Sequence, residues 1–356
     1  MSKTYRIGLL GLTHDHVWEN IKEAMALPNA TLVGAADPNL PLLEKFQQVT
    51  GVGAVRTDYE ALLDTVEMDG ILAFGSNHVN CGLTELAASR GLHVMTEKPM
   101  AASLAQADRM LVAASKAGTI LMVNWPTAWD PTICHALALA KEGAIGRIWQ
   151  LKWRGGHAGP KEVGCTPYFY NWLYDGQENG AGVLFDYCGY GASMAIQFIG
   201  LPSEVMAIAG RLVKSYIPVD DNAIVALQYH NANAVIETSW SEPISHHPPH
   251  DLILYGTGGV MIARELGGVV IYSQAKPDGI TYDPPALQAP TRNGPEYFVH
   301  CMETGTPPEG MCSAEASRRA QEIMEAALIS ARSGRRVALP LNDYLFRRHD
   351  CGCCGS

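Results

Sequence analysis

Gly91-Leu92-His93-Val94-Met95-Thr96-Glu97-Lys98-Pro99 runs from an apolar segment into a charged pair and a proline. The apolar part predicts a short buried strand. In a parallel sheet, ligands bind in the crevice outside the carboxyl ends of the strands, and Lys98 would stand at such an end. Pro99 restricts Lys98 to an extended backbone, which aims its side chain. Lys98 could act as an acid or base if burial and a nearby cation lowered its pKa, although the tripeptide alone is also compatible with a surface lysine before a turn.

Strand-like and helix-like segments alternate over the first 124 residues. Strands separated by helices require right-handed crossovers, so we expect an α/β fold whose N-terminal domain, residues 1–124, is a Rossmann-like, doubly wound parallel sheet. The expected strands are Tyr5–Leu10, Thr31–Ala36, Ala54–Arg56, Gly70–Phe74, His93–Thr96 and Ile120–Asn124, and the expected helices are Asp15–Ala26, Leu40–Thr50, a short one after the cap Asp58, Asn80–Arg90 and Ser103–Ala117.

From about residue 145 the pattern changes to strand-length runs joined by turns. This predicts an α+β domain over residues 125–343 with a large, mainly antiparallel open sheet, followed by a tail over 344–356. Residues 155–180 are rich in Gly, Pro, Tyr and Trp, which predicts a long functional loop. The expected strands are 148–154, 204–212, 222–229, 234–241, 251–256, 259–264 and 269–273, and the expected helices are 182–199 and 313–333, the latter capped by Ser313.

The composition is that of an ordinary globular chain of about two domains, with 356 residues, 47% of them hydrophobic and 17% charged. A formal charge of −10 argues against nucleic acid or an anionic membrane as a partner. No run is apolar enough to span a bilayer and no signal sequence precedes the first strand, so we expect a cytoplasmic protein. The nine cysteines include a terminal group, Cys351-Gly352-Cys353-Cys354, which is more typical of a frayed tail than of a metal site.

The first strand-to-helix turn is the expected cofactor site. A dinucleotide pyrophosphate rests at such a turn on backbone N–H groups and the positive end of the helix. Gly8, Gly11, Thr13 and His14 stand there, but the glycine pattern is imperfect because Thr13 and His16 occupy the second and third fingerprint positions. Asp37 ends the second strand, where a carboxylate can accept hydrogen bonds from the adenosine ribose. The expected cofactor is therefore NAD, with NADP possible, and the alternative is a doubly wound domain without a nucleotide.

His14 and His16 raise the question of a metal. They are two residues apart at the start of a helix, so they would not share a helical face. We therefore expect a histidine near the phosphates, or a packed one, and predict no metal site.

Motifs along nearly the whole chain resemble, in order, those of the Gfo/Idh/MocA family of sugar and polyol oxidoreductases. The Glu-Lys-Pro segment is specific in this setting and the others support it. The motifs are the N-terminal turn, Ala36-Asp37-Pro38, Asn77 after the fourth strand, Glu97-Lys98-Pro99, Glu142-Gly143-Ala144-Ile145-Gly146-Arg147-Ile148, Gly180-Ala181-Gly182-Val183-Leu184-Phe185-Asp186, the sheet motifs Asp220-Asp221-Asn222-Ala223, Glu237-Thr238-Ser239-Trp240 and Gly256-Thr257-Gly258-Gly259, and Gly334-Arg335-Arg336-Val337-Ala338-Leu339-Pro340. The resemblance implies that Ser76, Asn77, Glu97 and Lys98 also belong to the cofactor site.

The resemblance implies catalysis by Lys98 and by a histidine four residues after Asp186. Here that position is Tyr190. A spacing of four puts Asp186 and Tyr190 on one helical face, and a phenol beside an ammonium has its ionised form favoured. We expect Lys98 and Tyr190 to handle the hydroxyl proton while Asp186 orients the substrate or Lys98. The alternative is a core tyrosine in a binding protein or an altered member of the family.

Aromatic residues crowd the segments nearest to this site and predict a sugar pocket, since the C–H faces of carbohydrates pack on aromatic rings. The candidates for substrate contact are Trp125, His157, Tyr168 and Trp172. The segment Ser245-His246-His247-Pro248-Pro249-His250 predicts a rigid loop. We expect this loop to reach the pocket or a subunit interface, and the alternative is that it binds a metal.

The function that combines these features is an NAD(P)-dependent oxidoreductase that transfers a hydride between nicotinamide and a hydroxyl or carbonyl carbon of a sugar, inositol or related polyol. Two alternatives use the same scaffold: a glycoside hydrolase or lyase that oxidises its substrate transiently with tightly held NAD, and a non-catalytic sugar or nucleotide sensor. The resemblance also implies a homodimer or homotetramer formed through the open sheet, because an exposed apolar sheet face is otherwise a liability.

Overall fold

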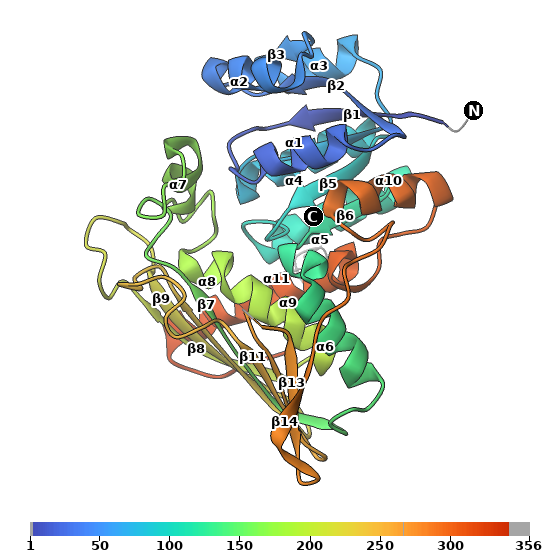
Figure 1. The fold of residues 1–356 in the computed structure, drawn as a ribbon. Helices are drawn as coiled ribbons and strands as arrows, with labels where there is room; N and C mark the ends of the chain where they lie inside the picture. Colours follow the sequence, from blue (N-terminus) through green and yellow to red (C-terminus); the bar gives the residue numbers. More distant parts are fainter. Residues whose placement is uncertain (1–2, 266, 342–356) are drawn as a thin grey trace, which may run out of the picture.

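The computed structural model describes residues 3–265 and 267–341. Two sheets form its frame, one above the other in Figure 1, and helices from both halves of the chain fill the space between them. The predicted α/β class with a parallel first sheet and a mainly antiparallel second sheet is confirmed. Among the described residues no helix has the length and apolarity needed to cross a membrane.

The first sheet has six parallel strands in the order β3-β2-β1-β4-β5-β6, in which the direction of winding reverses between β1 and β4. This reversal is the topological switch point, where the ends of adjacent strands diverge and leave room for a ligand. The elements are β1 Tyr5–Leu10, α1 Val17–Met25, β2 Ala30–Ala36, α2 Leu40–Thr50, β3 Val55–Arg56, α3 Tyr59–Thr65, β4 Gly70–Ala73, α4 Asn77–Ser89, β5 His93–Glu97, α5 Leu104–Ala117 and β6 Leu121–Asn124.

The second sheet has nine strands in the order β14-β13-β12-β11-β7-β10-β9-β8-β15. Its neighbours run antiparallel except β7 and β10, which are parallel. The remaining elements are η1 Pro126–Trp129, α6 Pro131–Lys141, β7 Ile148–Gly156, α7 Pro167–Leu173, α8 Val183–Asp186, α9 Cys188–Phe198, β8 Glu204–Gly210, β9 Asn222–Gln228, β10 Asn233–Ser239, β11 Leu252–Gly256, β12 Val260–Ala263, β13 Val269–Ser273, β14 Lys276–Tyr282, α10 Gly294–Thr304, η2 Gly310–Cys312, α11 Ala314–Ser333 and β15 Val337–Ala338.

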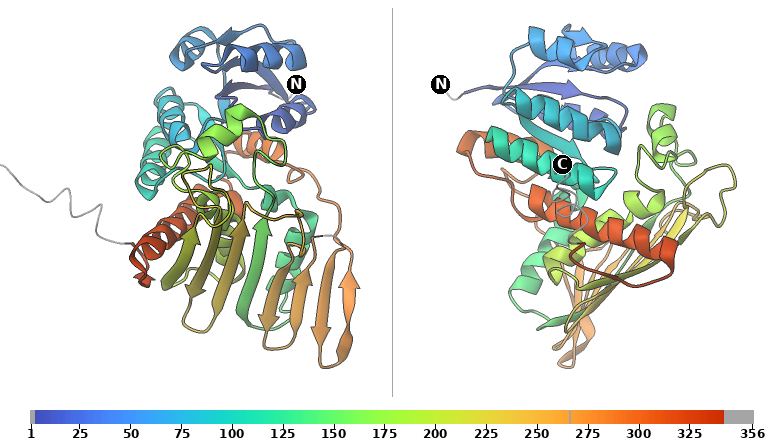
Figure 2. Two further views of the ribbon diagram at one scale, coloured as in Figure 1. Left: turned by 90° about the vertical axis from the view of Figure 1, so that its left-hand side faces the viewer. Right: turned by 180° about the vertical axis from the view of Figure 1, so that it is seen from behind.

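One face of the second sheet is covered and the other is open. Alternate residues of β8, β9 and β10 are buried, as in Ala223, Val225 and Leu227 of β9, and α9 and α11 pack on that side. The view on the left of Figure 2 looks onto the opposite face, where no helix covers the strands. This period of two is what places an apolar row against the helices and leaves the intervening row exposed.

The segments expected as one long loop and one long helix are each divided. Residues 155–180 contain α7, whose first helical position is Pro167, a place where a missing N–H costs nothing. The helix expected over 182–199 is interrupted at Tyr187, where Tyr190 N–H bonds to Tyr187 three residues back instead of four. Helices α6 and α10 and strand β14 are further elements for which no sequence prediction was made.

Helix α10 returns to the first sheet. Phe298, Val299 and Met302 on its buried face belong to the same apolar core as β1 and α1. Residues 294–304 therefore pack with the N-terminal half although they lie in the predicted second domain. The predicted boundaries themselves stay a prediction, and the predicted tail, residues 344–356, lies outside the described residues.

Candidate active site

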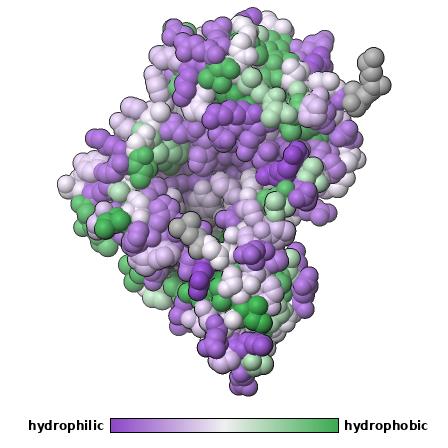
Figure 3. All heavy atoms as spheres, viewed as in Figure 1, coloured by the Kyte–Doolittle hydropathy of each residue, from purple (hydrophilic) through white to green (hydrophobic). Residues whose placement is uncertain are grey.

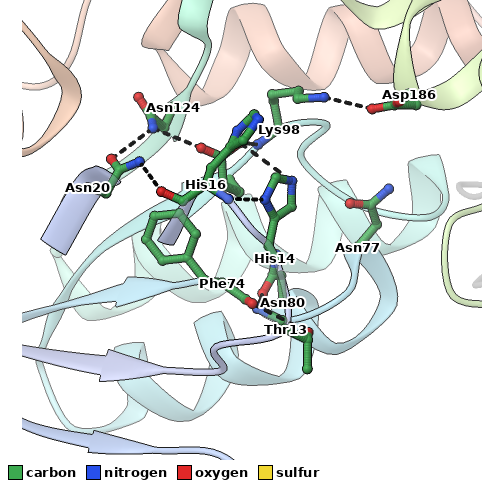
Figure 4. Close-up of polar contacts among 12 residues, drawn as sticks. Thr13, His14, His16, Asn20, Phe74, Asn77, Asn80, Lys98, Asn124 and Asp186 are labelled. Carbon is green, nitrogen blue, oxygen red and sulfur yellow. Dashed lines mark hydrogen bonds and ion pairs between the residues drawn. The ribbon is translucent and has the colours of Figure 1, made fainter. Parts of the chain in front are cut away.

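Lys98 and Asp186 form a buried ion pair between the two halves of the molecule. Lys98 follows β5 and Asp186 ends α8, and Lys98 Nζ lies 2.7 Å from Asp186 Oδ1 (Figure 4). The other carboxylate oxygen, Oδ2, accepts a hydrogen bond of 3.2 Å from the indole of Trp240. The two catalytic residues predicted from distant segments are therefore brought together, and a third residue fixes the orientation of the carboxylate.

The electrostatics around Lys98 differ from the sequence expectation. Burial alone would lower the pKa of Lys98, but the Asp186 carboxylate, with Tyr190 and Glu97, raises that pKa above its usual value. These neighbours are two carboxylates and a phenol and not the expected nearby cation, so Lys98 is an ammonium donor at neutral pH.

Tyr190 completes the group. Lys98 Nζ lies 4.5 Å from the centre of the Tyr190 ring, so the break in the helix does not separate Tyr190 from Asp186. Burial raises the pKa of Tyr190 to about 12, and Lys98 only partly opposes this. The phenol is therefore neutral at pH 7, contrary to the expectation that its ionised form is favoured.

Trp125 supports Tyr190 and does not face a substrate. Its side chain is fully buried, its indole N–H donates to Ser317 Oγ at 3.0 Å, and its ring packs edge-on against Tyr190 at 5.6 Å between centres. The prediction of substrate contact by Trp125 is wrong for this structure, because the strand β6 directs it into the core.

His157 lies one residue beyond β7, beside the catalytic group. Its ring packs edge-on against Tyr187 at 5.2 Å, and its Nδ1 accepts the Gly159 N–H at 2.9 Å. Burial lowers the pKa of His157, with Asp186 opposing this, so the imidazole is neutral and carries its proton on Nε2. This leaves the His157 Nε2–H available as a hydrogen-bond donor, and its role in binding substrate stays a prediction.

Glu97 is the centre of a buried polar network. Its Oε1 accepts the Asn124 amide at 2.9 Å, and its Oε2 accepts the Lys98 N–H at 3.0 Å. His16 Nδ1 lies 3.4 Å from Oε2, and His14 Nε2 lies 3.9 Å from it. Glu97 thereby ties the Lys98 backbone to the cofactor turn.

His14 and His16 lie next to each other, although they were expected not to share a helical face. Helix α1 begins only at Val17, so helical geometry does not apply to His14 and His16, and their ring centres are 4.5 Å apart. Burial, with His16 and Lys98, lowers the pKa of His14 well below its usual value, so its imidazole is neutral.

The first turn has the close backbone approach that a dinucleotide requires. Gly11 has φ +79°, and a Cβ there would lie 2.6 Å from Gly75 N. Gly11 N–H bonds to Ala36 and His14 N–H to Phe74, which fixes the turn across the switch point. Gly8 has a different place: it lies inside β1, and a Cβ there would meet Met68 at 2.6 Å, so Gly8 serves packing and its assignment to the cofactor site is wrong for this structure.

Asp37 supports the turn from below. Its side chain is fully buried, and its oxygens accept the Leu12 N–H at 2.6 Å and the Asn39 N–H and side-chain amide at 2.7 and 2.8 Å. The structure therefore does not present this carboxylate to a ribose. Asn39 takes the position that faces the groove.

A groove of about 600 Å³ lies at the switch point. The face shown in Figure 3 is hollowed between the two halves, and the surface around the hollow is mostly hydrophilic. The residues that line the groove are Thr13, Pro38, Asn39, Tyr59, Gly75, Ser76, Val79, Pro167, Tyr168, Asn171, Trp172 and Glu178. Tyr168 and Trp172, predicted as substrate contacts, thus belong to the wall of the cofactor groove, because α7 crosses over it.

Three contacts hold the segment around α7 against the first sheet. Asp15 accepts the Thr166 N–H at 2.7 Å and its hydroxyl at 2.6 Å. Ser76 donates to Glu178, and the Asn77 amide donates to Asn179 Oδ1 at 2.8 Å. The side-chain amide of Asn77, a predicted cofactor residue, is buried and is engaged by Asn179.

The residues that the sequence reasoning missed are those whose partners lie far away in the chain. Trp240 was noted only as part of a sheet motif, and Asp15 only as the start of a helix. No local spacing indicates that Trp240 reaches Asp186 or that Asp15 reaches Thr166, since both contacts exist only after the two halves have folded together.

Comparison with known proteins agrees with this arrangement. Residues 6–125 match the model of the oxidoreductase family with an NAD-binding Rossmann fold, and residues 133–262 match the GFO/IDH/MocA C-terminal domain. The chain belongs to the Gfo/Idh/MocA oxidoreductase family. This Gfo/Idh/MocA protein is thus an oxidoreductase with an NAD-binding domain, as the sequence predicted.

Relatives of this Gfo/Idh/MocA protein act on varied sugars. It is 24% identical over 347 residues to D-apiose dehydrogenase of Paraburkholderia graminis, covering 93% of this chain and 88% of the relative. It is 28% identical over 229 residues to 1,5-anhydro-D-fructose reductase of Ensifer adhaerens, covering 61% of this chain and 63% of the relative. The structure of levoglucosan dehydrogenase with NADH and levoglucosan has a TM-score of 0.79 at 19% identity, covering 95% of this chain and 100% of that one.

Proposed function

We propose that this protein is an NAD-dependent dehydrogenase acting on a CH–OH group of a sugar or polyol. The observation that carries the proposal is the Lys98–Asp186 pair, buried beside Tyr190 next to a groove at the switch point. The residues of the turn fit a dinucleotide, since Gly11 leaves the close backbone approach that a side chain would fill. Bound NAD supplies the hydride acceptor, and that redox chemistry is its own.

The protein's own groups position the alcohol and hold its proton. The Lys98 ammonium donates to the substrate oxygen and stabilises the negative charge that develops there as the hydroxyl proton leaves. Asp186, beside that ammonium, is the base available for the hydroxyl proton, directly or through Lys98. The neutral Tyr190 phenol and the His157 Nε2–H are two further donors that orient neighbouring hydroxyls. In the reverse direction the same path returns the proton to the substrate oxygen, from Asp186 directly or through Lys98.

A screen of sugars and polyols tests this proposal. The absorbance of reduced nicotinamide is followed with NAD and NADP in parallel. We expect turnover of at least one polyol with NAD, and a loss of about 10²–10⁴-fold in kcat for Lys98→Met. NAD affinity, measured by fluorescence, checks that the variant is folded. NAD binding with no turnover across the panel, or Lys98→Met at the wild-type rate, would contradict the proposal.

We infer also that the open face of the second sheet pairs with a second copy of the chain. Met206, Ile208 and Ile224 project from this face with 45%, 69% and 47% of their surface exposed. A shallow groove of about 310 Å³ runs beside them between Arg154 and Leu212. A row of exposed branched side chains on a flat sheet is the pattern expected of a homomeric contact.

A further inference from the structure

The loop over residues 241–250 carries a second cluster of histidines and carboxylates, at the end of the nine-stranded sheet nearest to His157. His246 and His250 lie in this loop before β11, and Glu265 lies just after β12. Because β11 and β12 pair, the residues before one and after the other meet. None of the three has a part in the proposed reaction.

Three possible metal ligands converge there. His246 Nδ1 contacts Glu265 Oε1, and His250 Nδ1 lies 3.4 Å from the same oxygen. The three ligand atoms all lie within 4.8 Å of one another. Ligands of a tetrahedral zinc ion, bound at about 2.0–2.2 Å, lie about 3.3–3.6 Å apart, so the cluster needs only a small adjustment.

A second layer of contacts holds His250 in the orientation that a metal requires. Its Nε2 lies 3.3 Å from Oε1 of Glu242, a buried carboxylate that Arg154 Nη1 contacts at 2.6 Å. The Glu265 Oε2 accepts the His250 N–H at 3.0 Å. A carboxylate that receives the far N–H of a metal-binding histidine fixes its tautomer and directs the other nitrogen at the ion.

The charges favour a metal over simple ion pairs. His250 Nε2 faces one carboxylate, Glu242, and His250 Nδ1 faces the Oε1 atom of a second, Glu265. His246 Nδ1 faces that same oxygen. The two imidazole rings, with centres 4.7 Å apart, therefore share one carboxylate oxygen. A single divalent ion satisfies all three groups.

We propose that His246, His250 and Glu265 bind a divalent cation of the zinc type, which fixes the 241–250 loop against the segment that carries His157. Two imidazoles and one carboxylate suit Zn²⁺, with a fourth position open to water or a ligand oxygen because His246 is 58% exposed. The loop bonds to the segment that carries His157, through Glu242 N–H to His157 O at 3.2 Å and Ala158 N–H to Ser245 Oγ at 3.1 Å. The ion would thus order the segment that carries His157.

One other group in the described parts of the chain has ligand spacing, namely His14, His16 and Glu97. It is less suited to a metal because Glu97 already accepts the Lys98 and Asn124 N–H groups. The positive Lys98 side chain also stands beside it and would repel a second cation.

Cobalt titration of the full-length, metal-free protein tests the proposal. The background carries Cys351→Ser, Cys353→Ser and Cys354→Ser so that the terminal thiols cannot bind the metal, and NAD is present at saturation. We expect one Co²⁺ per chain with the visible absorption of a four-coordinate site, and its displacement by Zn²⁺. His250→Ala and Glu265→Gln should weaken binding by more than about 100-fold, and Glu242→Gln by about 10–100-fold.

His247→Ala is the matched control, since this exposed neighbour contacts only the Ser245 carbonyl among the described residues, and it should leave the affinity unchanged. Thermal unfolding with and without Zn²⁺ shows whether each variant is folded, and only proteins with the site intact should be stabilised by the metal. Absence of stoichiometric binding would overturn the proposal. Equal binding by wild type and His250→Ala, with loss in His16→Ala, would move the site to the cofactor turn and overturn it as well.

Discussion

At the scale of single residues, the proposed role of Tyr190 depends on its protonation state. Tyr190 stands where the family has a histidine, and the structure makes it a neutral phenol beside an ammonium. A group that keeps its proton to about pH 12 cannot be the resting base at pH 7, so its contribution is to donate a hydrogen bond or a proton.

Tyr190→Phe tests that contribution, because it removes the hydroxyl and leaves the ring over Lys98. We expect kcat to fall about 10²-fold while NAD affinity stays within twofold. Wild-type kcat in Tyr190→Phe would reduce Tyr190 to a packing residue and leave Lys98 and Asp186 as the pair that acts.

At the scale of single elements, the loop over 211–221 depends on one carboxylate. Burial alone would raise the pKa of Asp221, but the backbone N–H groups of Leu212, Lys214 and Val213 and the Asn222 amide lower it to about 2. Asp221 is fully buried and accepts those three N–H groups at 2.6–2.8 Å. The loop that begins at the end of β8 is therefore folded around an ionised group.

Asp221→Asn should destabilise the protein by about 2 kcal/mol at pH 7, as the lowering of the Asp221 pKa to about 2 implies. A lowered pKa in the folded state gives stability that is complete above the unfolded value near 4 and is lost as pH falls toward 2. The difference in free energy of unfolding between wild type and Asp221→Asn, measured in urea, should accordingly shrink from pH 4 to pH 2. Asp278→Asn, at an exposed position of β14, is the control, and a difference independent of pH would contradict the assignment.

Helix α7 is the element that closes the cofactor groove, and Asp15 anchors its first turn. Asp15→Asn should weaken NAD binding about tenfold, the equivalent of one charge-assisted hydrogen bond, mainly through faster dissociation. Stopped-flow fluorescence measures both rates. Asp58→Asn exchanges one good helix cap for another at α3, and it should leave the association and dissociation rates of NAD unchanged. An unaltered dissociation rate in Asp15→Asn would show that α7 closes over the groove without this anchor.

At the scale of the whole molecule, one substitution tests the proposed pairing through the open sheet face. Ile208→Glu puts a charge at its most exposed apolar position and should convert the oligomer to a monomer, seen by light scattering after size exclusion. Val112→Glu, at a half-exposed position on α5, is the matched control and should not change the mass. A wild-type protein that is monomeric at tens of micromolar would contradict the proposed pairing.

The sequence by itself determined the two-sheet plan and the identity of the main chemical groups. The alternation of strands and helices before residue 124 is a local pattern, and so are the Glu97-Lys98-Pro99 segment and the four-residue step from Asp186 to Tyr190. Period and spacing are readable in a single chain because each depends on neighbours in sequence.

The tertiary structure alone decided what those groups face. The Asp37 carboxylate faces inward and accepts the Leu12 N–H, and Trp125 lies in the core. Tyr168, on α7, lines the cofactor groove. The protonation of Lys98 and Tyr190 was decided in the same way, since a pKa depends on burial and on charges from other segments. Contacts between residues nearly ninety positions apart, such as Lys98 with Asp186, exist only once both sheets have formed, so no local pattern contains them.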